Sequence, residues 1–380
     1  MNTPPPEVVS IGPAPPWRGG IARYHDALAS ALQEEGSRVT VLNFRRLYPR
    51  LLFPGTTPLD TGPGRLPDRG ERVLGPLDPM SWLRARRRAA ACVPDILLFQ
   101  WWSPFFAPAY LAVAGGTSER TRLGAVVHNV EPHESMPGGG WLTRRFLGRM
   151  DFFITGGREL ARRIRELRPG AEVEVITHPL YEPPSHPLPD RERARERLDI
   201  DPGEALFLFF GLVRPYKGLD VLIEALGLLP PGLPWYCLVS GEFYEDRRPY
   251  EERIQELGLE DRIRLEDRYI PDAEVPDRFA ACDLVVLPYR TATQSGAAAW
   301  ALAHGRPVLS TLTGALVDVI REGETGWLVP PGDPAALAGV LGRAAREPAF
   351  TRLEGLGDPG IPGWDEVARA VLRQASAEDA

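Results

Sequence analysis

The 380-residue chain contains almost no lysine. Of its 44 basic residues, 43 are arginines, and Lys217 is the only lysine. Because arginine fills every other basic position, the single ammonium group indicates a place that needs a compact point charge rather than a planar guanidinium. A lysine retained by chance is the competing interpretation, and the sequence leaves it open.

Hydrophobic runs long enough to cross a bilayer are also missing. The longest runs, 205–213 and 105–116, fall well short of the roughly 20 residues that a membrane-spanning helix needs. The start, Met1–Pro6, has neither the basic region nor the apolar stretch of a secretory signal. We therefore expect a cytoplasmic protein, and peripheral attachment to the inner membrane face stays open.

Cysteine is scarce, and its positions exclude a zinc cluster. The three cysteines, Cys92, Cys237 and Cys282, are widely spaced and lie in apolar runs. Such positions fit buried thiols in a reducing cytoplasm.

Length and composition predict two globular domains. At roughly 150 residues per domain, 380 residues suffice for two, each with its own core. Hydrophobic residues make up 43% and charged residues 25% of the chain, which excludes wholesale disorder, collagen and coiled coil.

Strands and helices are expected to alternate in both halves. Glu7–Ile11 is predicted as a strand, 12–20 as a Pro/Gly loop and Arg38–Phe44 as the next strand, with a helix between the loop and the second strand. Further strands are predicted at 96–100, 125–128, 151–155, 173–176, 205–210, 235–240, 263–265, 284–287 and 308–310. The Pro-rich stretch Glu182–Asp190 is the expected linker. The pattern is typical of an α/β protein with two Rossmann-like, doubly wound domains that face a cleft, at residues 1–181 and 191–360.

The charge is unevenly distributed. Residues 1–180 carry 23 arginines against 17 acidic residues, a net charge of +6, whereas the remainder carries −13. Arginines also stand beside aromatic residues in 45–53 and 141–146. An anionic membrane surface as a partner and arginine faces solvated by water explain this pattern equally well. We expect no nucleic-acid partner.

Three segments have the character of anion sites at helix starts. Trp17-Arg18-Gly19-Gly20 precedes the first predicted helix, and two glycines there let a ligand approach the backbone. Gly211–Gly218 follows an apolar strand and brings Arg214 and Lys217 to a helix start. Leu287–Gly296 supplies Gln294, Ser295 and Gly296 in the same manner. For the first segment a plain glycine turn remains an equal interpretation.

Taken in order, these segments resemble the retaining glycosyltransferases of family 4, which have the GT-B fold. The resemblance runs from about residue 8 to about residue 345 and includes AHGRPV at 303–308 and EGETGWLVPPGD at 322–333. It implies sugar transfer from a nucleotide diphosphate sugar, with no other cofactor, to a saccharide or lipid-linked acceptor, as in cell-surface polysaccharide or glycoconjugate synthesis. It also implies a last helix, 364–376, that packs back on the first domain.

The resemblance assigns roles to individual residues. His128, Arg214 and Lys217 would be catalytic, and Gly19, Gly20, Gly211, Gly218, Gln294, Ser295 and Gly296 would bind the donor. His128 ends an apolar strand before a polar loop, and a hydrogen-bonded core histidine is the competing interpretation. On the acceptor side the candidates are Arg18, Glu131, His133, Trp101 and Trp102. The two tryptophans fit a sugar platform and a hydrophobic core equally well.

The sequence departs from the family pattern at three positions. Ala292 and Trp300 stand where family members usually have two glutamates, the second of which reaches the ribose of the donor. Leu212 stands where an arginine is usual, and Arg214 is a nearby substitute.

Asp199-Ile-Asp201 imitates the DxD motif of metal-dependent glycosyltransferases but lies away from the phosphate loops. We interpret this segment as a solvated turn. We also expect no metal, because Arg214 and Lys217 would neutralise the phosphate charge. A non-catalytic nucleotide-sugar-binding protein remains an alternative. A Rossmann-type epimerase or oxidoreductase is a weaker one, because GxGxxG is absent after the first strand.

Overall fold

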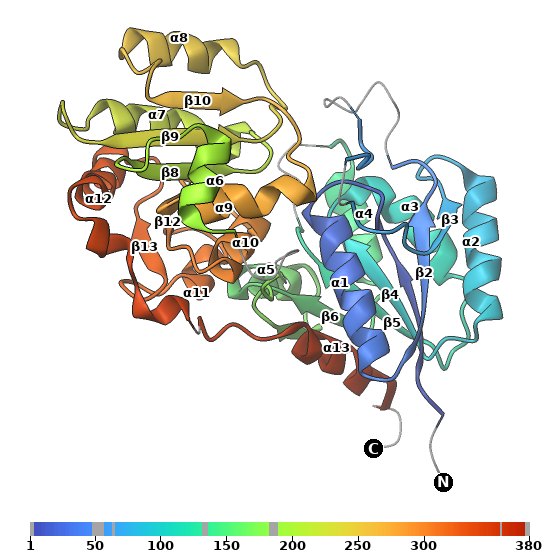
Figure 1. Cartoon of the computed structure of the whole chain (residues 1–380). Helices are drawn as coiled ribbons and strands as arrows, with labels where there is room; N and C mark the ends of the chain where they lie inside the picture. Colours follow the sequence, from blue (N-terminus) through green and yellow to red (C-terminus); the bar gives the residue numbers. More distant parts are fainter. Residues whose placement is uncertain are drawn as a thin grey trace. The chain divides into compact units, whose positions relative to one another are not determined.

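The computed structural model describes residues 4–47, 57–62, 65–130, 136–181, 189–357 and 359–376, and these form two compact units (Figure 1). The N-terminal unit comprises Met1–Thr61, Leu66–Pro179 and Pro362–Ala380. The C-terminal unit comprises Gly62–Arg65 and Leu180–Ile361. Most of the predicted linker lies outside the described residues.

The N-terminal unit is built on a seven-stranded parallel sheet in the order β3-β2-β1-β4-β5-β6-β7. Its strands are β1 (Glu7–Ile11), β2 (Arg38–Phe44), β3 (Glu71–Leu74), β4 (Ile96–Trp101), β5 (Arg122–Val127), β6 (Phe152–Thr155) and β7 (Glu172–Val175). Its helices are α1 (Gly20–Glu34), α2 (Pro79–Ala91), α3 (Ala107–Ala114), α4 (Gly139–Leu147), α5 (Arg158–Leu167) and α13 (Trp364–Arg373). The central strand β4 is buried over its whole length because helices cover both faces of such a sheet.

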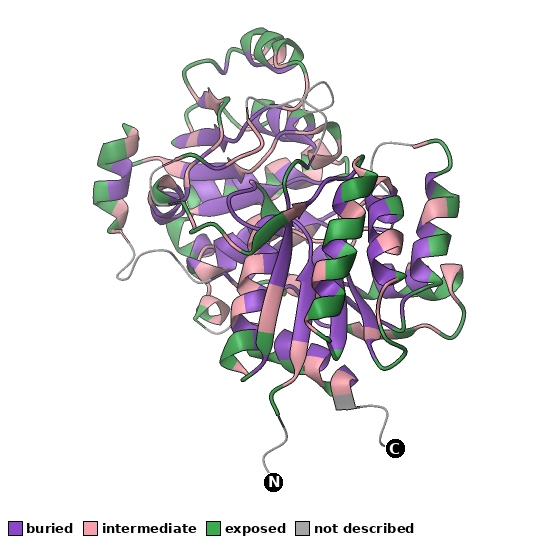
Figure 2. Ribbon diagram, turned by 90° about the vertical axis from the view of Figure 1, so that its right-hand side faces the viewer, coloured by how far each residue is buried: buried purple, intermediate pink, exposed green. Residues whose placement is uncertain are grey.

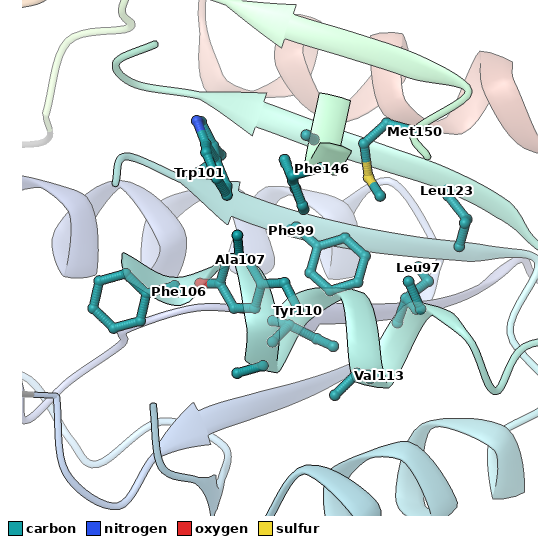
Figure 3. Packing of buried hydrophobic residues seen from close by; sticks show 14 of the residues in the cluster. Leu97, Phe99, Trp101, Phe106, Ala107, Tyr110, Val113, Leu123, Phe146 and Met150 are labelled. Carbon is teal, nitrogen blue, oxygen red and sulfur yellow. The ribbon is translucent and has the colours of Figure 1, made fainter. Parts of the chain in front are cut away.

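Aromatic side chains fill one face of this sheet (Figure 3). The Trp101 ring stacks on Phe146 of α4 with 4.0 Å between ring centres, and Tyr110 of α3 packs beside Phe99. All four residues are 0% exposed. At about 25 cal/mol per Å² of buried apolar surface, rings of this size contribute strongly to the stability of the unit.

The last helix belongs to the N-terminal unit, although 196 residues separate it from α5, the preceding helix of that unit. Helix α13 packs against α1, and Val367 and Val371 are buried in one cluster with Leu28 and Leu32. Its far side is exposed, as the burial colours of the helices show (Figure 2). The apolar face of α1 is therefore covered by the end of the chain.

The C-terminal unit has a six-stranded parallel sheet in the order β10-β9-β8-β11-β12-β13. Its strands are β8 (Ala205–Phe210), β9 (Trp235–Ser240), β10 (Ile263–Glu266), β11 (Leu284–Leu287), β12 (Val308–Thr311) and β13 (Gly326–Val329). Its helices are α6 (Arg191–Leu198), α7 (Leu219–Gly227), α8 (Arg248–Glu256), α9 (Val275–Ala281), α10 (Gly296–Ala303), α11 (Leu316–Val319) and α12 (Pro334–Arg346). In both sheets the strand order reverses beside the central strand, which is where doubly wound proteins bind ligands.

The predicted α/β class with two doubly wound domains is confirmed, and two strands were missed. Strand β3 is a short, half-polar edge strand, so it lacks the apolar run that marks the others. Strand β13 has only four residues and begins at Gly326, directly after the turn at 323–325.

Candidate functional site

The loop after β8 has a backbone that requires glycine at both ends. Gly211 has φ +100° and Gly218 has φ +71°, in the left-handed region. A Cβ atom on Gly218 would lie 2.1 Å from the Pro288 carbonyl oxygen. Between the two glycines a short 3-10 helix, Pro215–Lys217, leads into α7. The loop after β8 is thereby packed against the loop after β11.

Lys217 is half-buried in this loop, and within the described part of the chain no carboxylate pairs with it. Its Nζ atom lies 5.5 Å from the centre of the Tyr289 ring, in cation–π contact. On the other side it faces Gly211, where an added Cβ would be 3.2 Å from Nζ. Burial, and then repulsion by Arg214, lowers the pKa of Lys217 to about 8. An incoming anion would relieve both effects.

Arg214 comes from the same loop and is held over an aromatic ring. Its guanidinium carbon lies 4.9 Å from the centre of the Tyr244 ring. The backbone N–H of Tyr244 donates to Val213, and that of Val213 donates to Glu242, at 3.0 Å each. These bonds join the loops after β8 and β9, so both cations are presented by backbone that two neighbouring strands fix in place.

The loop after β11 places Ser295 at the start of α10. The Ser295 hydroxyl accepts from the backbone N–H of Ala298 at 3.2 Å and faces the Tyr289 hydroxyl. Tyr289 is 3% exposed, and burial raises the pKa of its phenol. One buried tyrosine therefore contacts both the ammonium group and the cap of α10, and sequence reasoning gave it no role. Gln294 lies just before the cap and is partly exposed.

In the N-terminal unit, the glycine pair stands at the exposed start of α1. Gly19 has φ +106°, and a Cβ on Gly19 or Gly20 would meet nothing within 4 Å. Trp17 beside them is 7% exposed, and its indole N–H donates to the Phe44 carbonyl at 2.9 Å. The backbone N–H of Arg18 donates to Pro58. The loop is thus anchored by its tryptophan, whereas its glycines are open to solvent.

His128 follows β5 directly and is 8% exposed. Its Nε2 atom lies 2.8 Å from the Gln100 side-chain oxygen, and its ring meets Tyr24 edge-on at 4.9 Å. Tyr24 also contacts His178 and Trp364 edge-on, at 5.2 and 4.8 Å. This group of Tyr24, His128, His178 and Trp364 was not predicted, because α1, β5 and α13 meet only in the folded unit.

Comparison with known proteins identifies the family. Residues 18–180 match the profile of Glycosyltransferase Family 4, and residues 204–347 match the profile described as Glycosyl transferases group 1. The chain belongs to this glycosyltransferase family. The first profile falls in the N-terminal unit and the second in the C-terminal unit, so both halves of the family architecture are present.

Two curated relatives illustrate the range of this glycosyltransferase family. A D-inositol 3-phosphate glycosyltransferase of Catenulispora acidiphila is 31% identical over 224 residues, which cover 55% of this chain and 50% of that protein. A lipopolysaccharide core biosynthesis mannosyltransferase of Rhizobium meliloti is 31% identical over 170 residues, 43% of this chain and 48% of that protein. The chain thus spans about half the length of the curated relatives it matches.

Solved structures share the GT-B fold over almost the whole chain. Sucrose-phosphate synthase from Thermosynechococcus elongatus superposes with a TM-score of 0.78 at 20% identity and covers 98% of this chain and 99% of its own. Anabaena HepE in complex with UDP-glucose superposes with a TM-score of 0.71 at 16% identity, covering 98% and 97%. At such identities the likeness establishes the fold alone.

Two departures of this chain from the family pattern have structural counterparts. Trp300 is 6% exposed and packs against Phe279 and His304 and, at 5.4 Å, against the Tyr181 ring. The Ala292 carbonyl lies beside Gly314, where a Cβ would approach it to 1.5 Å. An aromatic cluster and a close backbone contact thus occupy the positions where family members have the two glutamates.

The two tryptophans proposed for the acceptor side differ in burial. Trp101 is 0% exposed and stacked inside the core, so its interpretation as a sugar platform is wrong and the core interpretation is right. Trp102 is partly exposed, and the centre of its ring lies 4.2 Å from that of Phe106. Glu131 and His133 lie outside the described residues.

The DxD-like sequence is a turn. Asp199 ends α6 in the left-handed region, with φ +53°, and the Asp201 carboxylate accepts from the backbone N–H of Gly203 at 2.7 Å. Among the residues that the structure describes, no group of three or more His, Cys, Asp or Glu side chains has the geometry of a metal site. The same residues include no helix that is both long enough and apolar enough to cross a membrane.

Proposed function

We propose that this protein transfers a sugar from a nucleotide diphosphate sugar to a saccharide or lipid-linked acceptor with retention of anomeric configuration. The observation that carries the proposal is the environment of Lys217. Its ammonium group is half-buried, faces Arg214 and Tyr289, and has no carboxylate partner among the described residues. A diphosphate bound to both cations would offset the electrostatic repulsion between them.

The expected chemistry breaks the bond between the anomeric carbon and the diphosphate oxygen. Negative charge then develops on the departing diphosphate, where Lys217, Arg214 and backbone N–H groups near Ser295 would stabilise it. The acceptor hydroxyl would form the new bond on the same face of the sugar and give its proton to the departing phosphate oxygen. His128 would contact the transferred sugar. No carboxylate nucleophile is needed in this scheme.

A membrane-bound acceptor is supported by an exposed apolar rim on the N-terminal unit. Leu77, Met80 and Trp141 are 66%, 65% and 63% exposed, and Arg145 lies 5.9 Å over the Trp141 ring. These residues stand at the starts of α2 and α4, which both follow carboxyl ends of strands in one parallel sheet. Arginine beside exposed aliphatic and aromatic side chains is what an anionic lipid surface binds.

A nucleotide-sugar-binding protein without transfer activity is the alternative, because Ala292 and Trp300 replace two glutamates of the family pattern. The first test is a thermal-shift screen of nucleotide sugars with different bases and sugars. A ligand at 100 times its Kd adds about 2.7 kcal/mol to the free energy of unfolding. Transfer or hydrolysis of the stabilising donor would support the enzyme, stabilisation without either would support the binding protein, and no stabilisation by any donor would overturn both.

A further inference from the structure

Gln100, near the end of β4, is 0% exposed, and within the described part of the chain its side chain makes one polar contact. Its Oε1 atom lies 2.8 Å from Nε2 of His128. The neighbouring strands β4 and β5 are in register here, and the backbone N–H of His128 donates to the Trp101 carbonyl at 2.8 Å. The two side chains are therefore brought together by the sheet itself.

The position of the Gln100 side chain is over-determined. A Cβ atom on Gly12 would lie 2.5 Å from Cγ of Gln100, so the side chain lies flat against the Gly12 backbone. The Tyr110 hydroxyl donates to the backbone carbonyl of Gln100 at 3.0 Å, which fixes the main chain from which the side chain extends. Its amide nitrogen is buried without a partner among the described residues, a cost of about 1–3 kcal/mol that the fold tolerates at this place.

We propose that Gln100 is a positioning residue that holds His128 as the Nε2–H tautomer. An amide oxygen only accepts hydrogen bonds, so the ring nitrogen that faces it must carry the hydrogen. A neutral imidazole carries a hydrogen on only one ring nitrogen, so the lone pair is then on Nδ1. The hydrogen bond that one ring nitrogen makes thus determines which of the two is protonated. The consequence for sugar binding rests on the proposed function; the tautomer itself does not.

Three other histidines in the described part of the chain show the opposite arrangement. Nδ1 of His25, His178 and His304 faces the backbone carbonyls of Pro13, Pro179 and Trp300, at 3.0, 2.7 and 2.8 Å. A carbonyl accepts only, so these rings carry the hydrogen on Nδ1. They provide an internal reference within the same protein.

The tautomer has a chemical consequence for the reaction. With the hydrogen on Nε2, Nδ1 is the ring atom that can accept a hydrogen bond from a hydroxyl group of the transferred sugar. Tyr24 of α1 contacts the ring edge-on, and Gln100 of β4 is bonded to its Nε2 atom.

The test is the pattern of one-bond and long-range nitrogen–proton couplings in protein labelled with ¹⁵N-histidine, with no donor present. We expect His128 as Nε2–H and His25, His178 and His304 as Nδ1–H. Gln100→Met, which keeps length and removes the acceptor, should lose the His128 preference. Gly12→Ala should do the same by displacing Gln100, whereas Gly140→Ala, whose added methyl meets nothing within 4 Å, should not.

Gln100→Glu separates positioning from mere packing. The carboxylate keeps the acceptor, so above the imidazole pKa the Nε2–H tautomer should persist, and the His128 pKa should rise by about 1–3 units. If wild-type His128 carries its hydrogen on Nδ1, or if Gln100→Met leaves the tautomer unchanged in a folded protein, the proposal is overturned. Transfer by Gln100→Met should fall by about 10–100-fold in kcat. Absence of transfer in the wild type would instead defeat the proposed function and leave the tautomer result standing.

Discussion

The ammonium nitrogen of Lys217 lies 5.5 Å from the centre of the Tyr289 ring, whose hydroxyl faces Ser295 at the start of α10. The lone lysine and the cap of a helix are thus joined through one buried tyrosine. Three consequences concern this arrangement, a fourth concerns metal ions, and a fifth concerns the exposed rim.

Lys217→Met keeps the side-chain length and removes the charge, so transfer should fall by about 10²–10³ as for loss of one preorganised donor. Lys217→Arg should restore only part of it, because a planar fork is not a compact charge. Turnover at varied donor concentration measures the effect. Arg248→Met, at an exposed arginine already paired with Asp246, is the matched control. Wild-type turnover in folded Lys217→Met would leave the donor site without its main support.

Donor affinity should weaken as pH rises through about 8, because the folded pKa of Lys217 is lowered to that value and the neutral amine no longer attracts phosphate. The pKa is lowered from 10.5, so burial of the charged form destabilises the unliganded protein below pH 8, and this effect fades between pH 8 and 10.5. Lys217→Met should therefore melt no lower than the wild type at neutral pH. Titration calorimetry with the nucleoside diphosphate at pH 7 and 9 is the measurement, and a Kd equally pH-dependent in Lys217→Arg would assign the effect elsewhere.

Tyr289 can be divided into ring and hydroxyl. Tyr289→Phe keeps the cation–π contact and should change donor Kd by less than about threefold, whereas Tyr289→Leu loses it, at a cost of about 0.5–2 kcal/mol in binding. The comparison uses donor Kd together with the melting temperature of each variant. Equal Kd values for the two variants would show that the ring does not support the ammonium group.

Activity should persist in EDTA without added Mg²⁺, because Lys217, Arg214 and the start of α10 would stabilise the phosphate charge. The assay is transfer after dialysis against chelator, with and without Mg²⁺ or Mn²⁺ returned. Strict dependence on a divalent ion would overturn a metal-free donor site.

The protein should bind acidic phospholipid vesicles at low salt and be released as ionic strength rises, because screening shortens the reach of the arginines. Trp141→Ala should weaken binding at every salt concentration. Leu312→Ala, at a residue 55% exposed in the C-terminal unit, is the control. Cosedimentation that is equal for acidic and neutral vesicles at low salt would remove the membrane proposal.

The class of fold and the glycine-bounded loop after β8 could be predicted from the sequence alone. Apolar runs of four to seven residues between glycine and proline loops are local signals, and they identified most strands of both sheets. Gly211 and Gly218 could be found for the same reason, since a left-handed backbone selects glycine whatever lies nearby. The isolation of Lys217 was a matter of counting.

Which side chains meet could be learned only from the folded structure. Trp101 and Trp102 are neighbours in sequence with the same side chain, yet Trp101, the last residue of β4, is stacked in the core, whereas Trp102 lies beyond the end of the strand and is partly exposed. Gln100 and His128 are 28 residues apart and meet because β4 and β5 pair in register. Trp364 reaches Tyr24 from the far end of the chain. Such contacts depend on long-range pairing and packing, which no local pattern records.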